Sequence, residues 1–245
     1  MTVRKPTRGS LRLTVASLVA FAVLVVLVET AFEPLRLLDQ GVASGLHAYA
    51  RREPGLTGVL AVWTDVLGPW SWRAAVLLCA AWLVYRGAPR PAVWAVITII
   101  VGGFLGTWLK VFVGRERPHF TDPVAVAPDQ AFPSGHALNA TLGAGVLVLL
   151  ILPVLRGRPR LRALAWCVAG FLVLSVAYTR IALGVHWVSD VVGGVLLGVL
   201  VIAATTAGFE TWRRDLGPPP PSPLREDGEP EAADEPPRGR PRRLL

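Results

Sequence analysis

The chain has 245 residues, of which 53% are hydrophobic, and its mean hydropathy is +0.50. A soluble globular domain is less apolar than this, and here the apolar residues come in long blocks, so the composition excludes that class. The net charge of +8 would suit a nucleic-acid partner, but the cations are spread between the apolar blocks, which argues against nucleic-acid binding.

Six long apolar blocks predict an all-α fold, a polytopic membrane protein with six transmembrane helices. A hydrocarbon core of about 30 Å requires a helix of about 20 apolar residues, and most blocks come close to that length. The predicted spans cover residues 11–32, 59–85, 91–113, 135–154, 162–182 and 187–209. Together they define one transmembrane domain, residues 1–214.

The first part of the chain leaves some choices open. Residues 1–32 resemble a secretory signal peptide, but the apolar run is longer than a usual h-region and no small-residue cleavage site follows it, so we predict an uncleaved first helix. Residues 33–54 mix Leu and Val with charged side chains, which predicts an amphipathic helix along the membrane surface. The sequence GPW at 68–70 interrupts the second block and predicts a short interfacial piece before the true span.

The cations between the spans predict the orientation in the membrane. Most of them fall on alternate connections, which six spans place on one side. These cations are Arg4, Lys5, Arg8, Arg12, Arg86, Arg90, Arg156, Arg158, Arg160, Arg162, Arg213 and Arg214. Because positively charged loops stay in the cytoplasm, both termini are predicted to be cytoplasmic in a cell membrane. A composition rich in Ala, Val, Arg and Pro is typical of a bacterial protein.

Two features are not expected to carry chemistry. Residues 215–245, with the run PPPPSP and mixed charges, cannot form a core and predict a disordered cytoplasmic tail rich in Pro and Arg. Cys79 and Cys167 both fall inside apolar spans, so we expect small core hydrophobes rather than a disulfide or metal ligands.

Four cations depart from the orientation pattern. Lys110, Arg115 and Arg117 cluster around the outer end of the third span, and Arg180 lies near the outer end of the fifth. Charges at this depth are costly and mark functional sites, although snorkelling toward headgroups explains any one of them alone. Two of the four histidines reach the same level. Cations and histidines together predict a site for an anion with several oxygens at the extracytoplasmic face.

The stretch AFPSGHALNA, residues 131–140, begins the fourth span at this level. Ser134 is a good helix N-cap, and Pro133 discourages an earlier helical turn. The first turn then offers free backbone N–H groups and the positive end of the helix dipole, and Gly135 allows a ligand to approach closely. His136 is placed to give a proton to the group that the anion carries. A plain capped helix start is the alternative interpretation.

His186 and Asp190 begin the last span four residues apart, so they share one helix face. An aspartate at that spacing accepts a hydrogen bond from one ring nitrogen and leaves the other nitrogen as a nucleophile. The alternative is a His–Asp pair that only stabilises the start of the helix.

These three segments resemble the phosphatidic acid phosphatase type 2 (PAP2) superfamily of membrane lipid phosphatases. The motifs of that family are K-x6-RP, PSGH and SR-x5-H-x3-D. They correspond here to KVFVGRERP at residues 110–118, PSGH at residues 133–136 and TRIALGVHWVSD at residues 179–190. Thr179 stands where the family usually has serine and keeps a hydroxyl group. Arg115 lies outside the motifs, and the resemblance assigns it no role.

The resemblance implies a catalytic mechanism. His186 would attack phosphorus and become a phosphohistidine, with Asp190 orienting it, and His136 would protonate the leaving oxygen and then activate water. The phosphate oxygens would be held by Lys110, Arg117, Ser134, Gly135 and Arg180. No cofactor is implied, and because the sequence offers no carboxylate cluster suited to a divalent ion, we expect metal-independent turnover.

The substrate is expected to be a lipid phosphate or diphosphate whose tail enters between the helices. Phosphatidic acid, phosphatidylglycerol phosphate and undecaprenyl diphosphate are the candidates, because the motifs recognise phosphate and do not read the tail. A phosphotransferase on the same scaffold and a non-enzymatic lipid-phosphate binder or transporter are the alternatives. An intact His136, His186 and Asp190 disfavours the second of these, and the oligomeric state is open.

Overall fold

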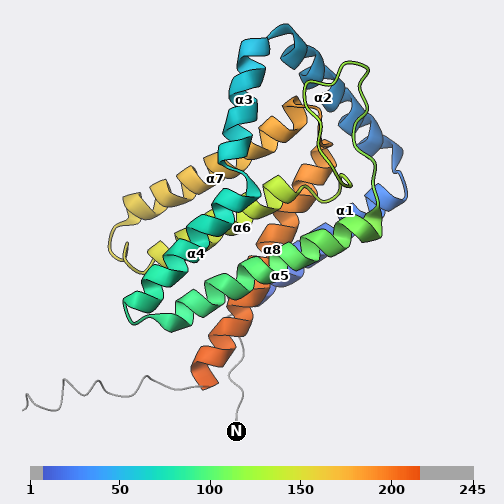
Figure 1. Ribbon diagram of the computed structural model, residues 1–245. Helices are drawn as coiled ribbons and strands as arrows, with labels where there is room; N and C mark the ends of the chain where they lie inside the picture. Colours follow the sequence, from blue (N-terminus) through green and yellow to red (C-terminus); the bar gives the residue numbers. More distant parts are fainter. Residues whose placement is uncertain (1–7, 216–245) are drawn as a thin grey trace, which may run out of the picture.

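The computed structural model describes residues 8–215, and every regular element in that range is an α-helix. The helices are α1 (Arg8–Glu29), α2 (Glu33–Arg52), α3 (Pro54–Val66), α4 (Pro69–Tyr85), α5 (Pro89–Val113), α6 (Gly135–Ile151), α7 (Pro159–Ala182) and α8 (Val188–Asp215). The predicted all-α fold is confirmed (Figure 1). The predicted disordered tail lies outside the described residues, apart from the last residue of α8.

Five stretches of these residues are long and apolar enough to cross a membrane, and α6 is a shorter sixth. The five are Gly9–Glu29, Pro54–Tyr85, Pro89–Val113, Pro159–Ala182 and Val188–Thr211. The second contains the predicted break, since α3 ends at Val66 and α4 begins at Pro69. The fourth predicted span is shorter than expected: α6 ends at Ile151, and its 17 residues measure only about 26 Å at 1.5 Å per residue.

α6 is the central helix of the bundle. It packs against α4, α5, α7 and α8, and α1 lies along α8 (Figure 1). Its residues from Ala137 to Ala144 are all buried. A Cβ atom on Gly143 would lie 2.4 Å from the Trp72 ring, so this close approach of α4 to α6 requires glycine. The start of α6 is therefore held by helices on several sides, which fixes the groups that it presents.

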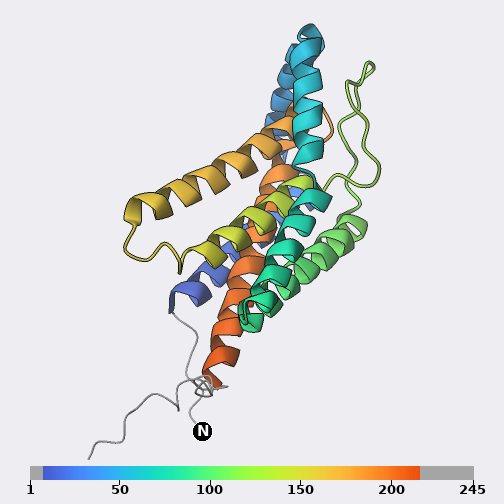
Figure 2. The same ribbon diagram turned by 60° about the vertical axis from the view of Figure 1, so that its left-hand side comes forward.

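The two ends of the bundle differ. The Ser10 hydroxyl donates a hydrogen bond to Glu210 at 3.2 Å, so α1 begins where α8 ends. The α4–α5 connection lies toward this end, whereas the long loop 114–134 lies toward the other (Figure 1 and Figure 2). The end that holds loop 114–134 also contains the start of α6 and the connection from α7 to α8. The three segments that the sequence singled out therefore meet at one end.

α2 and α3 form a V-shaped pair beyond this end and join at Glu53 (Figure 1 and Figure 2). α2 is amphipathic, as predicted. Its buried residues, which follow one helix face, are Asp39, Ala43, His47 and Ala50. α2 packs against α7 and α8, so this helix is held by protein. Its predicted place along a lipid surface stays a prediction.

The cysteines are both free thiols. Cys79 is half-buried, but Cys167 is exposed on α7, so the prediction of a core position is wrong for Cys167. Hydrophobic patterning does not separate a side chain that faces lipid from one that faces protein, because both environments are apolar.

Candidate active site

Backbone contacts join loop 114–134, the start of α6 and the start of α8. The Ser134 N–H donates to the Asp190 carbonyl at 2.9 Å, and the Ala131 N–H donates to the Arg115 carbonyl at 2.8 Å. A Cβ atom on Gly194 would lie 2.5 Å from the Ser134 carbonyl oxygen. Only glycine permits this approach, which brings the first turns of α6 and α8 together. The PSGH segment and the His–Asp pair therefore lie side by side.

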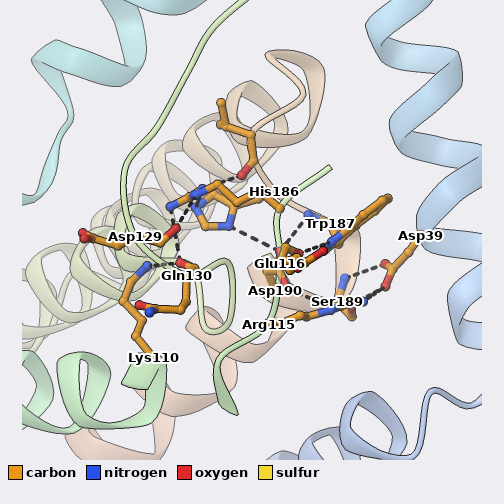
Figure 3. A network of polar contacts seen from close by, with 12 residues as sticks. Asp39, Lys110, Arg115, Glu116, Asp129, Gln130, His186, Trp187, Ser189 and Asp190 are labelled. Atoms are coloured by element: carbon orange, nitrogen blue, oxygen red, sulfur yellow. Dashed lines mark hydrogen bonds and ion pairs between the residues drawn. The ribbon is translucent and has the colours of Figure 1, made fainter. Parts of the chain in front are cut away.

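The His186 ring is buried between two partners. Its Nδ1 atom lies 3.4 Å from Asp190 Oδ2, and its Nε2 atom lies 3.1 Å from Arg117 Nη1. An arginine can only donate, so Nε2 accepts and Nδ1 carries the proton that points to Asp190. Asp190 Oδ2 also accepts the Trp187 N–H at 2.8 Å. The geometry thus gives His186 a fixed tautomer with a lone pair on Nε2 (Figure 3).

The surroundings of the His186 imidazole, which lies in the connection between α7 and α8, favour its neutral form. Burial lowers the pKa of His186 well below its usual value of 6.5, and the positive charges of Arg117, Arg180 and Lys110 lower it further. A protonated ring would have to enter a buried site that already holds cations. His186 therefore has the protonation state that a nucleophile needs.

Arg117 shapes the loop as well as facing His186. Its Nε and Nη2 atoms donate to the carbonyls of Asp129 and Pro128 at 3.0 and 2.8 Å. Burial is the main cause that lowers the pKa of Arg117 from its ordinary value. Lys110 Nζ donates to the carbonyl of Gln130 in the same loop. The two cations of the first motif are thus held by backbone oxygens that carry no net charge. Figure 3 shows the contact of Lys110 with Gln130.

The start of α6 differs from the prediction in one respect. Ser134 occupies the N-cap position, and its carbonyl accepts the Leu138 N–H at 3.0 Å, but its side chain makes no capping hydrogen bond. The Ser134 hydroxyl is buried without a partner among the described residues. The backbone N–H groups of Gly135 and His136 also have no partner there, and neither has the half-buried His136 ring. The hydroxyl and the N–H groups are donors available to a ligand.

Arg180 approaches from the end of α7. Its side chain is 7% exposed, and its Nε atom is buried without a partner in residues 8–215. Its hydrogen bond within the described residues is a long one, 3.5 Å from Nη1 to the Thr64 hydroxyl in α3. A buried guanidinium with so few partners is costly unless an anion completes it. Arg180 therefore supports an anion site in the same way as Ser134.

A network of hydrogen bonds on the other side of Asp190 was not predicted from the sequence. Arg115 donates to Asp190 Oδ1 at 2.6 Å and to Asp39 Oδ2 at 2.8 Å. The Ser189 N–H donates to Asp39 Oδ1 at 2.9 Å, so α2 is tied to the start of α8 (Figure 3). Arg115 was noticed as a cation but received no role. The signal for Asp39 was a carboxylate on the buried face of an amphipathic helix.

Known proteins are similar to this chain in sequence. Phosphatidylglycerophosphatase B of Bacillus subtilis is 34% identical over 93 residues, which cover 38% of this chain and 45% of that protein. An undecaprenyl-diphosphatase of Sulfolobus acidocaldarius is 31% identical over 121 residues, 47% of this chain and 54% of that protein. The chain thus spans about half the length of these curated relatives.

The fold has a close match among solved structures. The crystal structure of a transmembrane PAP2 type phosphatidylglycerolphosphate phosphatase from Bacillus subtilis superposes with a TM-score of 0.73 at 23% identity, over 82% of this chain and 98% of that one. The model of the PAP2 superfamily matches residues 91–214, which contain all the predicted site residues. The chain therefore belongs to the PAP2 superfamily.

Proposed function

We propose that this chain is an integral membrane lipid phosphatase that hydrolyses a lipid phosphate or diphosphate through a phosphohistidine at His186. The orientation of the His186 ring carries the proposal. Its Nδ1–H points to Asp190, 3.4 Å away, while Nε2 faces Arg117 and the unpartnered donors of the site. A buried neutral imidazole whose Nε2 lone pair faces Arg117 and the other cations of the site suits nucleophilic attack on phosphorus once a phosphate takes the place of that contact.

In the first step, Nε2 of His186 bonds to phosphorus and the bond to the lipid oxygen breaks. His136, in the first turn of α6, gives that oxygen a proton. In the second step, His136 takes a proton from water, the water oxygen bonds to phosphorus, and phosphate leaves His186. Asp190 holds the ring and balances its charge while phosphorus is attached. General acid–base assistance of this kind contributes roughly 10²–10⁴-fold.

The developing charge on phosphate is met by donors that the fold already holds in place. They are Lys110, Arg117, Arg180, the Ser134 hydroxyl and the N–H group of Gly135. Phosphoryl transfer depends chiefly on positioning and on charge stabilisation, which such donors supply. We therefore propose turnover without a metal ion.

The relatives suggest the substrates to test. Their names refer to phosphatidylglycerol phosphate and undecaprenyl diphosphate, and phosphatidic acid adds a lipid with a single phosphate. All three combine a phosphate headgroup with a long apolar tail, which fits an active site at the end of an apolar bundle. We also propose that this end faces outward and that both termini are cytoplasmic. Thiol labelling of single cysteines in loop 114–134 of intact cells tests that orientation, because labelling only after the cells are opened would reverse it.

The deciding experiment measures phosphate release from these lipids in detergent micelles. His186→Ala should abolish release, while His119→Ala, which removes an exposed histidine of loop 114–134, should retain it. Acid-labile radioactivity on the protein from a labelled substrate should appear in the wild type and be absent from His186→Ala. Unchanged hydrolysis by His186→Ala would overturn the mechanism. Loss of lipid phosphate only when an alcohol acceptor is added would instead identify a phosphotransferase.

A further inference from the structure

A fifth cation, Arg73, lies near the site but outside the family motifs. It is in the first turns of α4, within a stretch apolar enough to cross a membrane. Its Nε atom donates to Asn139 Oδ1 at 2.9 Å, and its guanidinium lies 5.2 Å from the centre of the Trp70 ring. The Nη1 and Nη2 groups have no hydrogen-bond partner within residues 8–215. A charge at such depth with its outer donors free is a candidate for ligand binding.

Arg73 lines a cavity between α4, α5 and α6. The cavity has a volume of about 270 Å³, and its walls include Arg73, Thr107, Lys110, Gln130, Gly135 and Asn139. Lys110 and Gly135 also belong to the proposed phosphate site, so the cavity begins where that site ends. A single water molecule needs only about 10–15 Å³ of such space, so the cavity is many times larger than that. It is large enough for a polar headgroup rather than for a single ion.

The charges of the cavity favour an anion. Two cations, Arg73 and Lys110, line it together with one carboxylate, Asp129. Figure 3 shows the Asp129 side chain pointing away from Lys110 and Gln130. Lys110 uses one of its three donor hydrogens on the Gln130 carbonyl, so the two free Nη groups of Arg73 add donors to a wall where Lys110 can also still donate. Arginine binds phosphate oxygens through parallel N–H groups, which suits that chemistry.

We propose that Arg73 and this cavity bind a second phosphate in the headgroup of the lipid substrate, next to the phosphate that reacts at His186. The inference rests on the proposed function and narrows its substrate class. Lipids with two phosphates in the headgroup, such as phosphatidylglycerol phosphate or a polyprenyl diphosphate, fill both places. Phosphatidic acid has one phosphate and leaves Arg73 unused. Arg73 is therefore a residue that determines specificity.

A purely structural role for Arg73 has a different signature. Asn139, which accepts from Arg73, also donates to the Gly135 carbonyl at 2.8 Å, so Arg73 braces the start of α6 indirectly. Loss of that brace would slow the reaction of every substrate alike. Loss of the contact to a second phosphate would slow only the reaction of lipids that carry two phosphates. The selectivity between two substrates separates the roles, and it is insensitive to the fraction of protein that folds.

The experiment compares phosphatidylglycerol phosphate with phosphatidic acid of the same acyl chains, in one detergent. The measured quantity is the kcat/KM for the first lipid divided by that for the second. In Arg73→Gln this ratio should fall about tenfold, the size of one charge-assisted hydrogen bond of about 1.4 kcal/mol. In Arg73→Lys the ratio should fall less than in Arg73→Gln. Asn139→Ala, which removes the brace and keeps the cation, should leave the ratio within about twofold of the wild type.

Arg86→Gln is the matched control, because Arg86 also lies over a tryptophan of α4, at 5.6 Å from Trp82, but next to the far end of that helix. Its ratio should equal that of the wild type. A wild-type enzyme active on both lipids with an unchanged ratio in Arg73→Gln would overturn the second phosphate site alone. Activity on phosphatidic acid without activity on phosphatidylglycerol phosphate would also overturn it. A wild-type protein that releases phosphate from no lipid would overturn the proposed function itself.

Discussion

The two sides of the His186–Asp190 pair are built on opposite principles. On the His186 side, the hydroxyl of Ser134 and the Nε group of Arg180 are buried without partners in the described residues. On the Asp190 side, every group is paired: Arg115 donates short hydrogen bonds to Asp190 and Asp39, and the Ser189 N–H donates to Asp39. A folded protein leaves buried donors unpaired only where another molecule completes them or where strain is tolerated. The first side is therefore suited to binding, and the second side to holding the pair in place.

This contrast predicts that substitutions on the two sides have different effects. On the open side, removing the Ser134 hydroxyl or the Arg180 guanidinium costs activity and little stability, because at most one long hydrogen bond within the protein is lost. On the paired side, removing a partner leaves a buried charge without compensation, so stability falls first. Four substitutions or conditions test the contrast, beginning with the largest effect.

Arg180→Gln should reduce kcat/KM by about 10²–10³-fold, the effect of removing one donor from a preorganised anion site. The thermal midpoint in detergent should stay at or above that of the wild type, because a poorly paired buried guanidinium is removed. Phosphate release and thermal unfolding of the same preparation measure both quantities. Arg160→Gln, at the start of α7, is the control for an arginine far from the site. A drop in stability that accounts for the lost activity would contradict the assignment of Arg180 to the open side.

Asp39→Ala should cost about 3–5 kcal/mol of stability, since it breaks a buried ion pair and leaves Arg115 with one carboxylate fewer. The comparison is Glu33→Ala on the same helix. Glu33 forms an exposed pair with Arg36 three residues on, so its loss should not measurably change unfolding. Unfolding in a denaturant series, followed by tryptophan fluorescence, provides the values. Equal effects of the two substitutions would show that the Asp39 network does not hold the site.

Ser134→Ala sharpens the contrast at a neutral group. Removal of one hydrogen bond from a hydroxyl to a charged phosphate oxygen, worth about 1.5 kcal/mol, lowers kcat/KM by about tenfold. Stability should not change, because the hydroxyl makes no capping bond. A side chain that capped α6 would instead cost about 1 kcal/mol of unfolding free energy on replacement by alanine. Thermal unfolding therefore distinguishes a ligand-binding serine from a capping serine.

The same two sides differ in how far the sequence predicts them. The open side consists of three local motifs with fixed spacing, and each motif is carried by one helix end. Lys110, Ser134 and His186 could therefore be placed at one membrane level from apolar blocks and their boundaries alone. The break between α3 and α4 was predicted for the same local reason, since Pro69 cannot continue a helix.

The paired side was not predicted because its contacts are distant in the chain. Asp39 bonds to Ser189 across 150 positions, and Arg115 to Asp190 across 75. A single sequence shows that Asp39 lies on an amphipathic helix and that Arg115 is out of place, but it does not show that they meet. The short α6 was missed for another reason. Apolar residues continue to Val154, and hydropathy does not register where the helix ends.

The smallest expected effect is a displacement of the acid limb of the pH profile. In the proposed mechanism His186 reacts only when neutral. Burial lowers its pKa well below 6.5, so kcat/KM should keep its plateau as the pH falls through 6.5 and decline only below it. Arg117→Gln removes one of the cations that lower this pKa, so the pKa rises and the limb moves to higher pH. Burial is the larger cause and remains, so the limb should still lie below pH 6.5. Ionisation of the lipid phosphate is common to both enzymes, so the difference between their profiles reports the two histidines that face Arg117, His186 and His136. An acid limb that lies at the same pH in Arg117→Gln and in the wild type would mean that the Arg117 guanidinium does not lower the pKa of His186.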